Sequence, residues 1–286
     1  MMHMPAPDEL VAIEGPDAIA FAHAQFSSDV RSLAPGCWHW SAWLNARGRV
    51  QNFFALLRTE PTHLMLWLPL GGAYVMAQGL QRFKIRAKLE IRVLDGWGSR
   101  SVPLAGIDPI SERYAVRRLG KGYALVLPGS SLCMTTLAPI HAEVQAPRAA
   151  VIGDVFAGLP FLSPSLAGEL LPQALDLERL GAIRFDKGCY PGQEIAARLH
   201  FRGGDKSLLY RLALPACTEP PEPGTPVMHE DQPVGRVLYG VRDADADYVR
   251  LLAALPVSLD EATRLVVPPD HEVADLSHEF ATPHTA

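Results

Sequence analysis

A nine-residue segment that begins at Asp186 holds the densest group of reactive and turn-forming side chains in the sequence. Its cysteine, Cys189, is flanked by Gly188 and by the pair Pro191-Gly192, and these residue types favour tight turns. Lys187 lies two positions before the cysteine, and a nearby cation lowers the pKa of a thiol and raises its thiolate fraction. A thiolate on a turn can act as a nucleophile or as a metal ligand, whereas a loop cysteine packed as a small hydrophobe is the alternative.

The other three cysteines lack such surroundings, and we expect them to be structural. They are Cys37, Cys133 and Cys217. No C-x-x-C pair occurs and no two histidines have the spacing of zinc ligands, so the sequence predicts no self-contained zinc or iron–sulfur site. Four cysteines are also too few for a disulfide scaffold, which predicts reduced thiols in a cytosol-like compartment.

A basic segment follows a predicted helix over residues 73–81. Apolar residues alternate from 82 to 93 with charged ones, all basic except Glu90, and this period of two predicts a strand with one basic face. The basic residues are Arg82, Lys84, Arg86, Lys88 and Arg92. The trio Arg198, His200 and Arg202 repeats the pattern on a shorter segment. Such faces suit a polyanion, either a polyglutamyl folate tail or a nucleic-acid backbone, and the alternative is a solvated face balanced by acids.

Three tryptophans, Trp38, Trp40 and Trp43, lie on a predicted strand over residues 37–44. A turn joins this strand to a second strand over residues 50–58, which makes a hairpin. Trp38 and Trp40 share one face of the strand, where a pterin ring could stack on them. Ordinary packing in the core is the alternative for these two side chains.

The length, composition and net charge of the whole chain limit the possible classes of protein. Its 286 residues, 48% hydrophobic and 20% charged, are enough for two domains that each bury a core. This composition excludes a disordered, collagen-like or coiled-coil protein. The net charge of −5 and the pI near 6.1 exclude a protein that is basic over its whole surface, although they allow a local basic face.

The N-terminal ten residues have no basic region followed by an apolar one, so we expect no signal peptide. The longest uncharged run, residues 64–80, is broken by Pro69 and by Gly71-Gly72, which argues against a membrane span. These features predict a cytoplasmic protein.

The predicted elements indicate an α+β fold with a change of pattern near residue 205. Strands and helices are mixed over residues 1–205, a region that could contain two intertwined subdomains. Short strands with Pro-, Gly- and Asp-rich turns then predict a small β-barrel over residues 206–267. The polar residues 268–286 are expected to form a flexible tail.

The segment around Cys189 resembles the K-G-C-[FY]-x-G-Q-E signature of the folate-binding YgfZ family, whose members are relatives of the aminomethyltransferase (T-protein) of the glycine cleavage system. Every position of the signature is filled in this sequence. The residues are Lys187, Gly188, Cys189, Tyr190, Gly192, Gln193 and Glu194. Further similarity on both sides of the signature and near the N-terminus extends the resemblance over about residues 10 to 210.

The resemblance implies an aminomethyltransferase-like folate-binding body followed by a β-barrel, with tetrahydrofolate as the cofactor. Members of the family assist the assembly or repair of iron–sulfur clusters in client enzymes, including enzymes that modify tRNA, and the signature cysteine matters for that role. On this basis we expect Cys189 and Lys187 to be the catalytic residues. The expected folate contacts are Trp43, Asn52, Arg86, Arg198 and Arg202.

Two departures from the T-protein pattern bear on catalysis. T-proteins carry an acidic pair after the first hairpin turn, but this chain has Gln51 and Asn52 there, and an amide cannot act as a general base. Before Gly158, Ala150 and Phe156 stand where the family often has an aromatic residue and a glutamate. We therefore expect an accessory folate-binding protein more than an enzyme. The alternatives are a tetrahydrofolate-dependent aminomethyltransferase or demethylase and a module that contacts tRNA through its basic faces.

Overall fold

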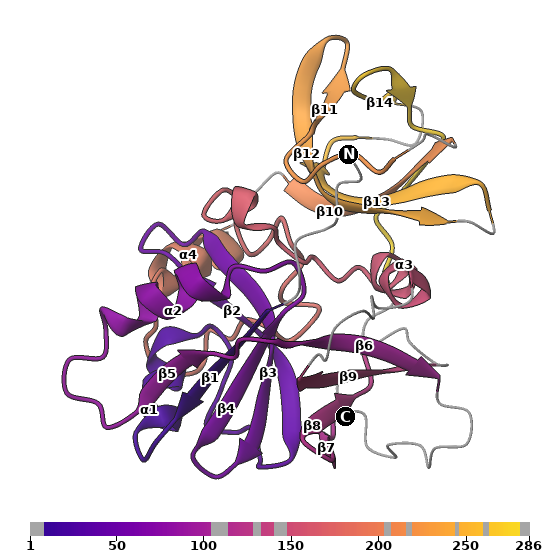
Figure 1. Cartoon of the computed structure of the whole chain (residues 1–286). Coiled ribbons are helices and arrows are strands. Elements are labelled where there is room, and N and C mark those ends of the chain that lie inside the picture. The colour runs from indigo at the N-terminus through magenta and orange to yellow at the C-terminus, as the bar shows by residue number, and fades with distance from the viewer. Residues whose placement is uncertain are drawn as a thin grey trace.

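The computed structural model describes residues 9–103, 114–127, 133–139, 148–202, 207–215, 219–243, 246–259 and 263–280. In this part of the chain the fold is α+β, with antiparallel strands gathered in three sheets and a small number of helices (Figure 1). The α+β class predicted from the sequence is therefore confirmed.

The first sheet has the strand order β2-β3-β4-β1-β5. Its strands are β1 (Glu9–Glu14), β2 (Cys37–Leu44), β3 (Val50–Glu60), β4 (His63–Leu68) and β5 (Glu90–Val93). Two helices pack on one of its faces, namely α1 (Ala18–Gln25) and α2 (Ala73–Gln81). Alternation along β3 decides which side chains meet which layer, because Phe54 and Leu56 face the helices while Phe53 and Leu57 face the opposite core.

The second sheet has the order β6-β9-β8-β7. Its strands are β6 (Trp97–Pro103), β7 (Arg117–Leu119), β8 (Gly122–Leu125) and β9 (Cys133–Pro139). Helix α3 (Arg148–Phe156), the short 3₁₀ helix η1 (Pro164–Leu166) and helix α4 (Gln193–Arg202) follow it in the chain. The signature segment leads directly into α4, so its position depends on how this helix is held.

The third sheet curls into a half-barrel with the order β15-β14-β11-β12-β13-β10-β16, which confirms the predicted C-terminal barrel (Figure 1). Its longer strands are β10 (Ser207–Pro215), β11 (Pro226–His229), β12 (Gln232–Asp243) and β13 (Tyr248–Pro256). Its short strands are β14 (Val266–Val267), β15 (His271–Glu272) and β16 (Asp275–Ser277). The predicted boundary at residue 205 falls within residues 203–206, which lie outside the described residues.

The prediction of a flexible tail from residue 268 is wrong for its first part. Strand β15 pairs with β14, and β16 pairs with β10 at the edge of the half-barrel. Strands of two or three residues are too short to show a period of two, so the sequence pattern did not reveal them. Residues 281–286 of the predicted tail lie outside the described residues.

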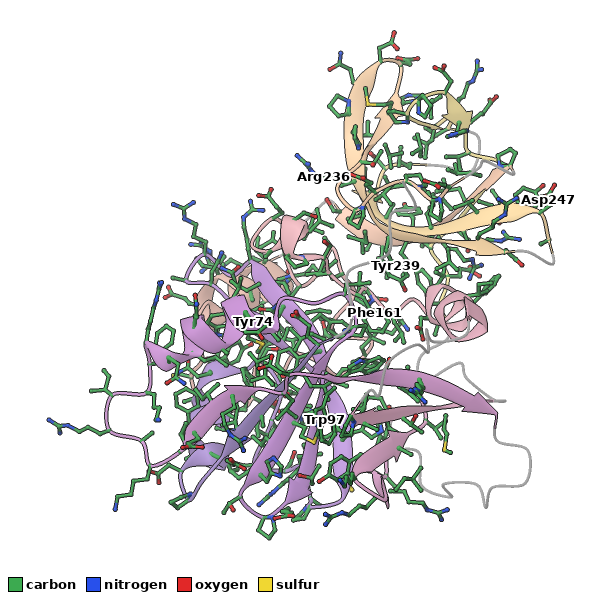
Figure 2. The ribbon with its side chains drawn as sticks, viewed as in Figure 1. Tyr74, Trp97, Phe161, Arg236, Tyr239 and Asp247 are labelled. Carbon is green, nitrogen blue, oxygen red and sulfur yellow. The ribbon has the colours of Figure 1, made fainter. Side chains whose placement is uncertain are left out.

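One hydrophobic core joins the three sheets. It contains Trp40 from the first sheet, Leu137 from the second and Tyr239 from the half-barrel. Phe161, on the segment after α3, stacks on Tyr239 with ring centroids 6.0 Å apart and also contacts Trp40 at 5.8 Å. Figure 2 shows Phe161 and Tyr239 between the half-barrel and the rest of the protein. The half-barrel is therefore packed on the body through shared aromatic side chains.

Candidate functional site

The signature segment is fastened to the end of helix α1 by Lys187. The Lys187 ammonium donates hydrogen bonds to the backbone carbonyl oxygens of His23 (2.5 Å), Phe26 (2.5 Å) and Ser28 (2.9 Å). The His23 carbonyl belongs to the last turn of α1, where carbonyls lack partners within the helix, and the other two follow the helix end. Three acceptors match the three donors of an ammonium group. Burial lowers the pKa of Lys187 to about 8, and the nearby Asp29 carboxylate opposes that shift.

Tyr190 and Gln193 hold the segment from its other side. The Tyr190 ring lies 4.9 Å from the Lys187 ammonium, and its hydroxyl donates to the carbonyl oxygen of Arg184 at 3.0 Å. Burial raises the pKa of Tyr190 above its usual range, so this hydroxyl stays a donor. The Gln193 amide donates to the carbonyl oxygens of Phe185 (3.3 Å) and Lys187 (3.4 Å). Both side chains therefore fix the backbone of the segment.

Gly192 places the segment against the hairpin turn between β2 and β3. Its φ of +76° belongs to the left-handed region, which favours glycine. A β-carbon at Gly192 would lie 2.3 Å from the carbonyl oxygen of Asn45 and 2.8 Å from the α-carbon of Gly48. Gly48 in turn faces Ile195 of α4, with its own hypothetical β-carbon 3.0 Å from the Ile195 β-carbon. Two glycines thus allow the segment and the turn to touch through their backbones.

Cys189 is exposed in this arrangement, whereas the side chains of Lys187, Tyr190 and Gln193 point into the protein and make the contacts above. Glu194 is also exposed, in the first turn of α4, where a negative charge is favourable. Cys37 is a free, half-buried cysteine on β2. The Cys133 side chain and Cys217 lie outside the described part of the protein. The structure therefore presents one thiol to solvent on a fixed loop.

A polar group that the sequence did not predict as functional lies beneath this loop. The Nδ1 atom of His23 lies 3.3 Å from Oδ1 of Asp29, and the imidazole is only 7% exposed. On the other side of the ring, a β-carbon at Gly188 would lie 3.6 Å from Nε2 of His23. Burial lowers the pKa of His23, and the charges of Lys187 and Arg31 lower it further. The His23 ring therefore favours its neutral form.

A second, half-buried histidine belongs to this polar group. Nε2 of His39 lies 2.9 Å from the hydroxyl of Ser28, which donates to the Ser41 hydroxyl at 2.7 Å. Burial lowers the pKa of His39 to about 4, so this ring is neutral at neutral pH. A sequence signal did exist, because His39 alternates with Trp38 and Trp40 on the predicted strand and must face the opposite side.

Two of the five predicted folate contacts lie together. Trp43 on β2 is the cross-strand neighbour of Asn52 on β3. The Trp43 ring packs against α2 so closely that a β-carbon at Gly79 would lie 2.3 Å from its Cη2 atom. The predicted arginines occupy exposed positions elsewhere: Arg86 follows α2, while Arg198 and Arg202 are one turn apart on α4.

The predicted basic strand over residues 82–93 is wrong except for β5. Turns extend α2 at its C-terminal end, where the amide groups of Phe83 and Lys84 donate to Leu80 and Gln81, and residues 85–89 are irregular. This connection projects from the body (Figure 1), and its Ile85 is 84% exposed. The alternating sequence therefore does not form a strand before β5. The side chains of Leu80 and Leu89, on the two sides of this segment, are both buried.

The shorter basic pattern and the aromatic prediction also need correction. Residues 198–202 belong to helix α4, so Arg198 and Arg202 share a face while His200 contacts Glu178 at 2.9 Å. Trp38 and Trp40 are each 1% exposed and pack edge to face with ring centroids 5.1 Å apart. The core-packing alternative for these tryptophans is therefore confirmed, and neither ring face is open to a pterin.

A buried acid on α3 is a further residue that the sequence analysis missed. Asp154 is 8% exposed, and burial raises its pKa well above the usual carboxyl range. Asp154 makes no side-chain hydrogen bond or ion pair with the described residues. The charge of Asp154 helps to raise the pKa of Tyr239, whose hydroxyl donates to the carbonyl oxygen of Leu159 at 2.9 Å. An isolated acid in an apolar helix was the available signal, and such perturbed groups are candidates for ligand binding.

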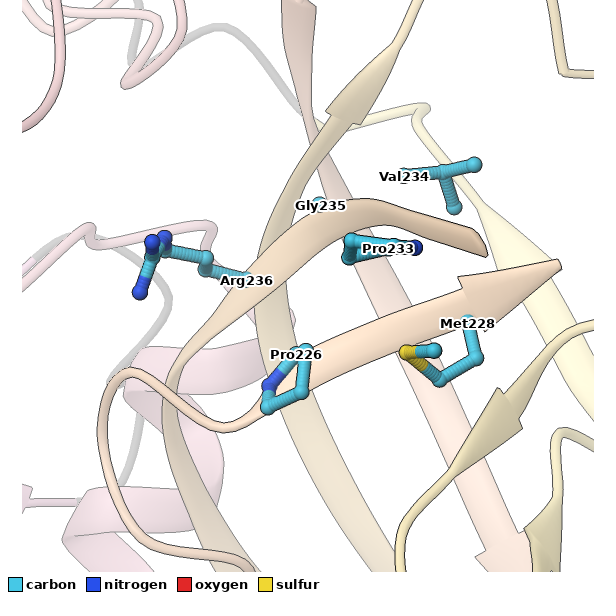
Figure 3. Close-up of a pocket in the computed structure, with 6 residues that line it drawn as sticks. All are labelled: Pro226, Met228, Pro233, Val234, Gly235 and Arg236. Carbon is cyan, nitrogen blue, oxygen red and sulfur yellow. The ribbon is translucent and has the colours of Figure 1, made fainter. Parts of the chain in front are cut away.

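An open groove lies on the half-barrel between β11 and β12, with a volume of about 560 Å³ (Figure 3). Its lining residues are Pro226, Met228, Pro233, Val234, Gly235 and Arg236. None of the predicted site residues lines this groove. Among the described residues, no helix combines the length and apolar character that crossing a membrane requires.

The three sheets, their shared aromatic core and the loop docked on α1 define a protein of the aminomethyltransferase fold. The glycine cleavage system aminomethyltransferase T from Bartonella henselae has the same fold, with a TM-score of 0.68 over 99% of this chain and 87% of that chain. The two sequences are 17% identical, so this likeness concerns the fold alone.

The sequence is similar to proteins named tRNA-modifying protein YgfZ, which confirms the resemblance seen in the signature. The protein from Vibrio vulnificus (strain YJ016) is 27% identical over 77% of this chain and 72% of its own length. That from Klebsiella pneumoniae (strain 342) is 27% identical over 74% and 71%, and that from Serratia proteamaculans (strain 568) is 28% identical over 71% and 68%. No protein-family model matches the chain.

Proposed function

We propose that this protein is a folate-binding accessory protein of the YgfZ type that supports the assembly or repair of iron–sulfur clusters in client enzymes, tRNA-modifying enzymes among them. Cys189 is its working thiol, and the cytoplasm, where thiols stay reduced, is its compartment. The observation that carries the proposal is the exposed Cys189 on a loop whose other signature side chains are used to hold it in place.

Tetrahydrofolate fits the residues at the junction of the sheets. Asp154 is a buried carboxyl group without a partner among the described residues, and a pterin carries adjacent N–H groups that a carboxylate can accept. Phe161 and Tyr239 lie at this junction but stack on each other in the core, so neither offers an open ring face. We propose that Asp154 binds the pterin, and that the predicted contacts Trp43 and Asn52, on the α2 side of the first sheet, contact another part of the folate. The bound cofactor would supply a one-carbon carrier.

The deciding variant is Cys189→Ala, with Cys37→Ser as the matched control because it removes the half-buried cysteine of β2. In cells that lack the protein, Cys189→Ala should restore client activity no better than an empty vector, while Cys37→Ser should restore it fully. Tetrahydrofolate affinity and thermal stability of Cys189→Ala should stay close to those of the original protein because an exposed side chain is removed. Full client activity with Cys189→Ala would show that the thiol has no part in the function.

A second candidate function, a tetrahydrofolate-dependent aminomethyltransferase or demethylase, is favoured by Asp154, which could handle a proton near the cofactor. Against it, the positions after the first hairpin turn hold the amides of Gln51 and Asn52. Incubation with tetrahydrofolate and aminomethyl or N-methyl donors should therefore yield no methylene-tetrahydrofolate. Formation of this product, and its loss in Asp154→Asn, would establish the enzyme instead.

A further inference from the structure

We propose that His23 is the proton acceptor for the Cys189 thiol and that Asp29 orients its ring. This inference rests on the proposed role of Cys189 and deepens it, because it names the group that would generate the thiolate. The sequence analysis placed Lys187 beside the thiol as a cation that lowers its pKa. Its ammonium donates to three backbone carbonyls and has no lone pair, so it can stabilise a thiolate by charge but cannot accept the proton.

The geometry places the His23 ring between an acid and the cysteine loop. Asp29 lies 3.3 Å from Nδ1, and the position of a β-carbon on Gly188 lies 3.6 Å from Nε2. Cys189 is the next residue after Gly188, and consecutive α-carbons are about 3.8 Å apart. The Cys189 side chain is exposed, and we infer that rotation about its χ1 brings Sγ toward Nε2. Such hydrogen bonds are often long until a partner binds.

The charged groups around His23 favour this role. Its ring is more than nine-tenths buried, and Nδ1 has no aligned hydrogen-bond partner among the described residues besides the Asp29 contact. Burial and the cations Lys187 and Arg31 keep the ring neutral, while Asp29 stabilises the cation that forms once a proton arrives. A proton on Nδ1, facing Asp29, leaves the lone pair of Nε2 directed at the loop.

The chemical step is a single proton transfer followed by attack. The Sγ–H proton moves to Nε2 of His23, and the Sγ electron pair is then free to attack an electrophile. With iodoacetamide as a probe, the S–C bond forms, the C–I bond breaks, and iodide leaves. The proton on His23 then passes to solvent. The cations Lys187 and Arg31 stabilise the negative sulfur and limit the lifetime of the protonated ring.

The test is the pH profile of Cys189 alkylation by iodoacetamide between pH 5.5 and 9.5, read by mass spectrometry on the peptide that contains Cys189. In His23→Gln the midpoint should move upward by about one pH unit, with a rate at pH 7 about tenfold lower. Asp29→Asn should shift the midpoint in the same direction by a smaller amount. His63→Gln, a histidine on β4 that bonds Thr59, serves as the control and should leave the profile unchanged.

Superimposable profiles for His23→Gln and the original protein would overturn the proposal, and so would an equal shift in His63→Gln. If His23→Gln fails to fold, NMR titration of the His23 ring in the original protein and in Cys189→Ser gives the answer. Equal ring pKa values in these two proteins would also overturn it, because coupled groups must shift each other. Loss of client activity in Cys189→Ala together with an unchanged alkylation profile in His23→Gln would retain the proposed function and reject only this inference.

Discussion

Replacing Gly192 with alanine should lower the free energy of unfolding by about 3 kcal/mol or more, the largest single-residue loss that we expect in this protein. The added β-carbon would lie 2.3 Å from the Asn45 carbonyl oxygen and 2.8 Å from the Gly48 α-carbon, and both are backbone atoms that cannot rotate away. The loop and the β2–β3 turn must then separate. Urea unfolding followed by far-UV circular dichroism measures the change.

Gly36→Ala is the matched control for this result. Gly36 has a φ of +81°, close to the +76° of Gly192, but a β-carbon there would meet no atom within 4 Å. It therefore reports the cost of the left-handed backbone alone, about 1 kcal/mol. Equal losses in the two variants would mean that the loop and the turn are not in close contact, and the account of the signature glycine would be wrong.

The signature is thus explained by position more than by reactivity. Lys187 occupies the carbonyls that α1 leaves open, Gln193 and Tyr190 bond the loop backbone, and Gly192 allows contact with the turn. Cys189 and Glu194 are the polar signature side chains that are exposed, and of these two Cys189 is the one that can act as a thiolate nucleophile. The contacts of these four residues together hold the Cys189 loop in one place relative to His23 and Asp29.

Local patterns predicted the elements whose own residues decide their structure. The strand over residues 37–44 and the helix over residues 73–81 have the predicted bounds, because alternation or a helical apolar face coincides with clear turn residues at each end. The basic segment failed where two patterns compete. Period-two alternation favoured a strand at residues 82–89, but the turns that extend α2 and the burial of Leu89 decide the outcome.

The candidate site shows a different limit of sequence reasoning. Cys189 was found because its neighbours in sequence are unusual. The His23 imidazole lies beside the preceding residue, Gly188, although more than 160 positions separate the two in the chain, and no local pattern relates them. Lys187 is close to Cys189 in sequence, yet its ammonium turns toward the end of α1. Proximity in sequence therefore suggested Lys187 as the partner of the thiol, whereas tertiary packing places the Lys187 ammonium at the end of α1.

Asp154→Asn should stabilise the protein and weaken folate binding at the same time. The pKa of Asp154 is raised in the folded state, so the folded protein favours the neutral carboxyl. The cost of this group is absent below its unfolded pKa near 3.9 and grows as the pH rises toward the folded pKa. Asparagine has the same shape and no charge. We expect it to add about 1–3 kcal/mol to the free energy of unfolding at pH 8 and little at pH 4.

The same substitution should reduce the affinity for tetrahydrofolate at least about tenfold, because a hydrogen bond to a charged group is worth about 1.5–3 kcal/mol. Calorimetric titration at pH 8 measures this affinity, and urea unfolding at pH 4 to 8 measures the stability difference. Asp270→Asn, at an exposed position of the half-barrel, is the control and should change neither. An unchanged folate affinity would place Asp154 outside the cofactor site, while a loss of stability at pH 8 would show that its carboxylate has a partner in the folded protein. A higher free energy of unfolding together with a lower tetrahydrofolate affinity would indicate that Asp154 serves ligand binding at a cost to the stability of the fold.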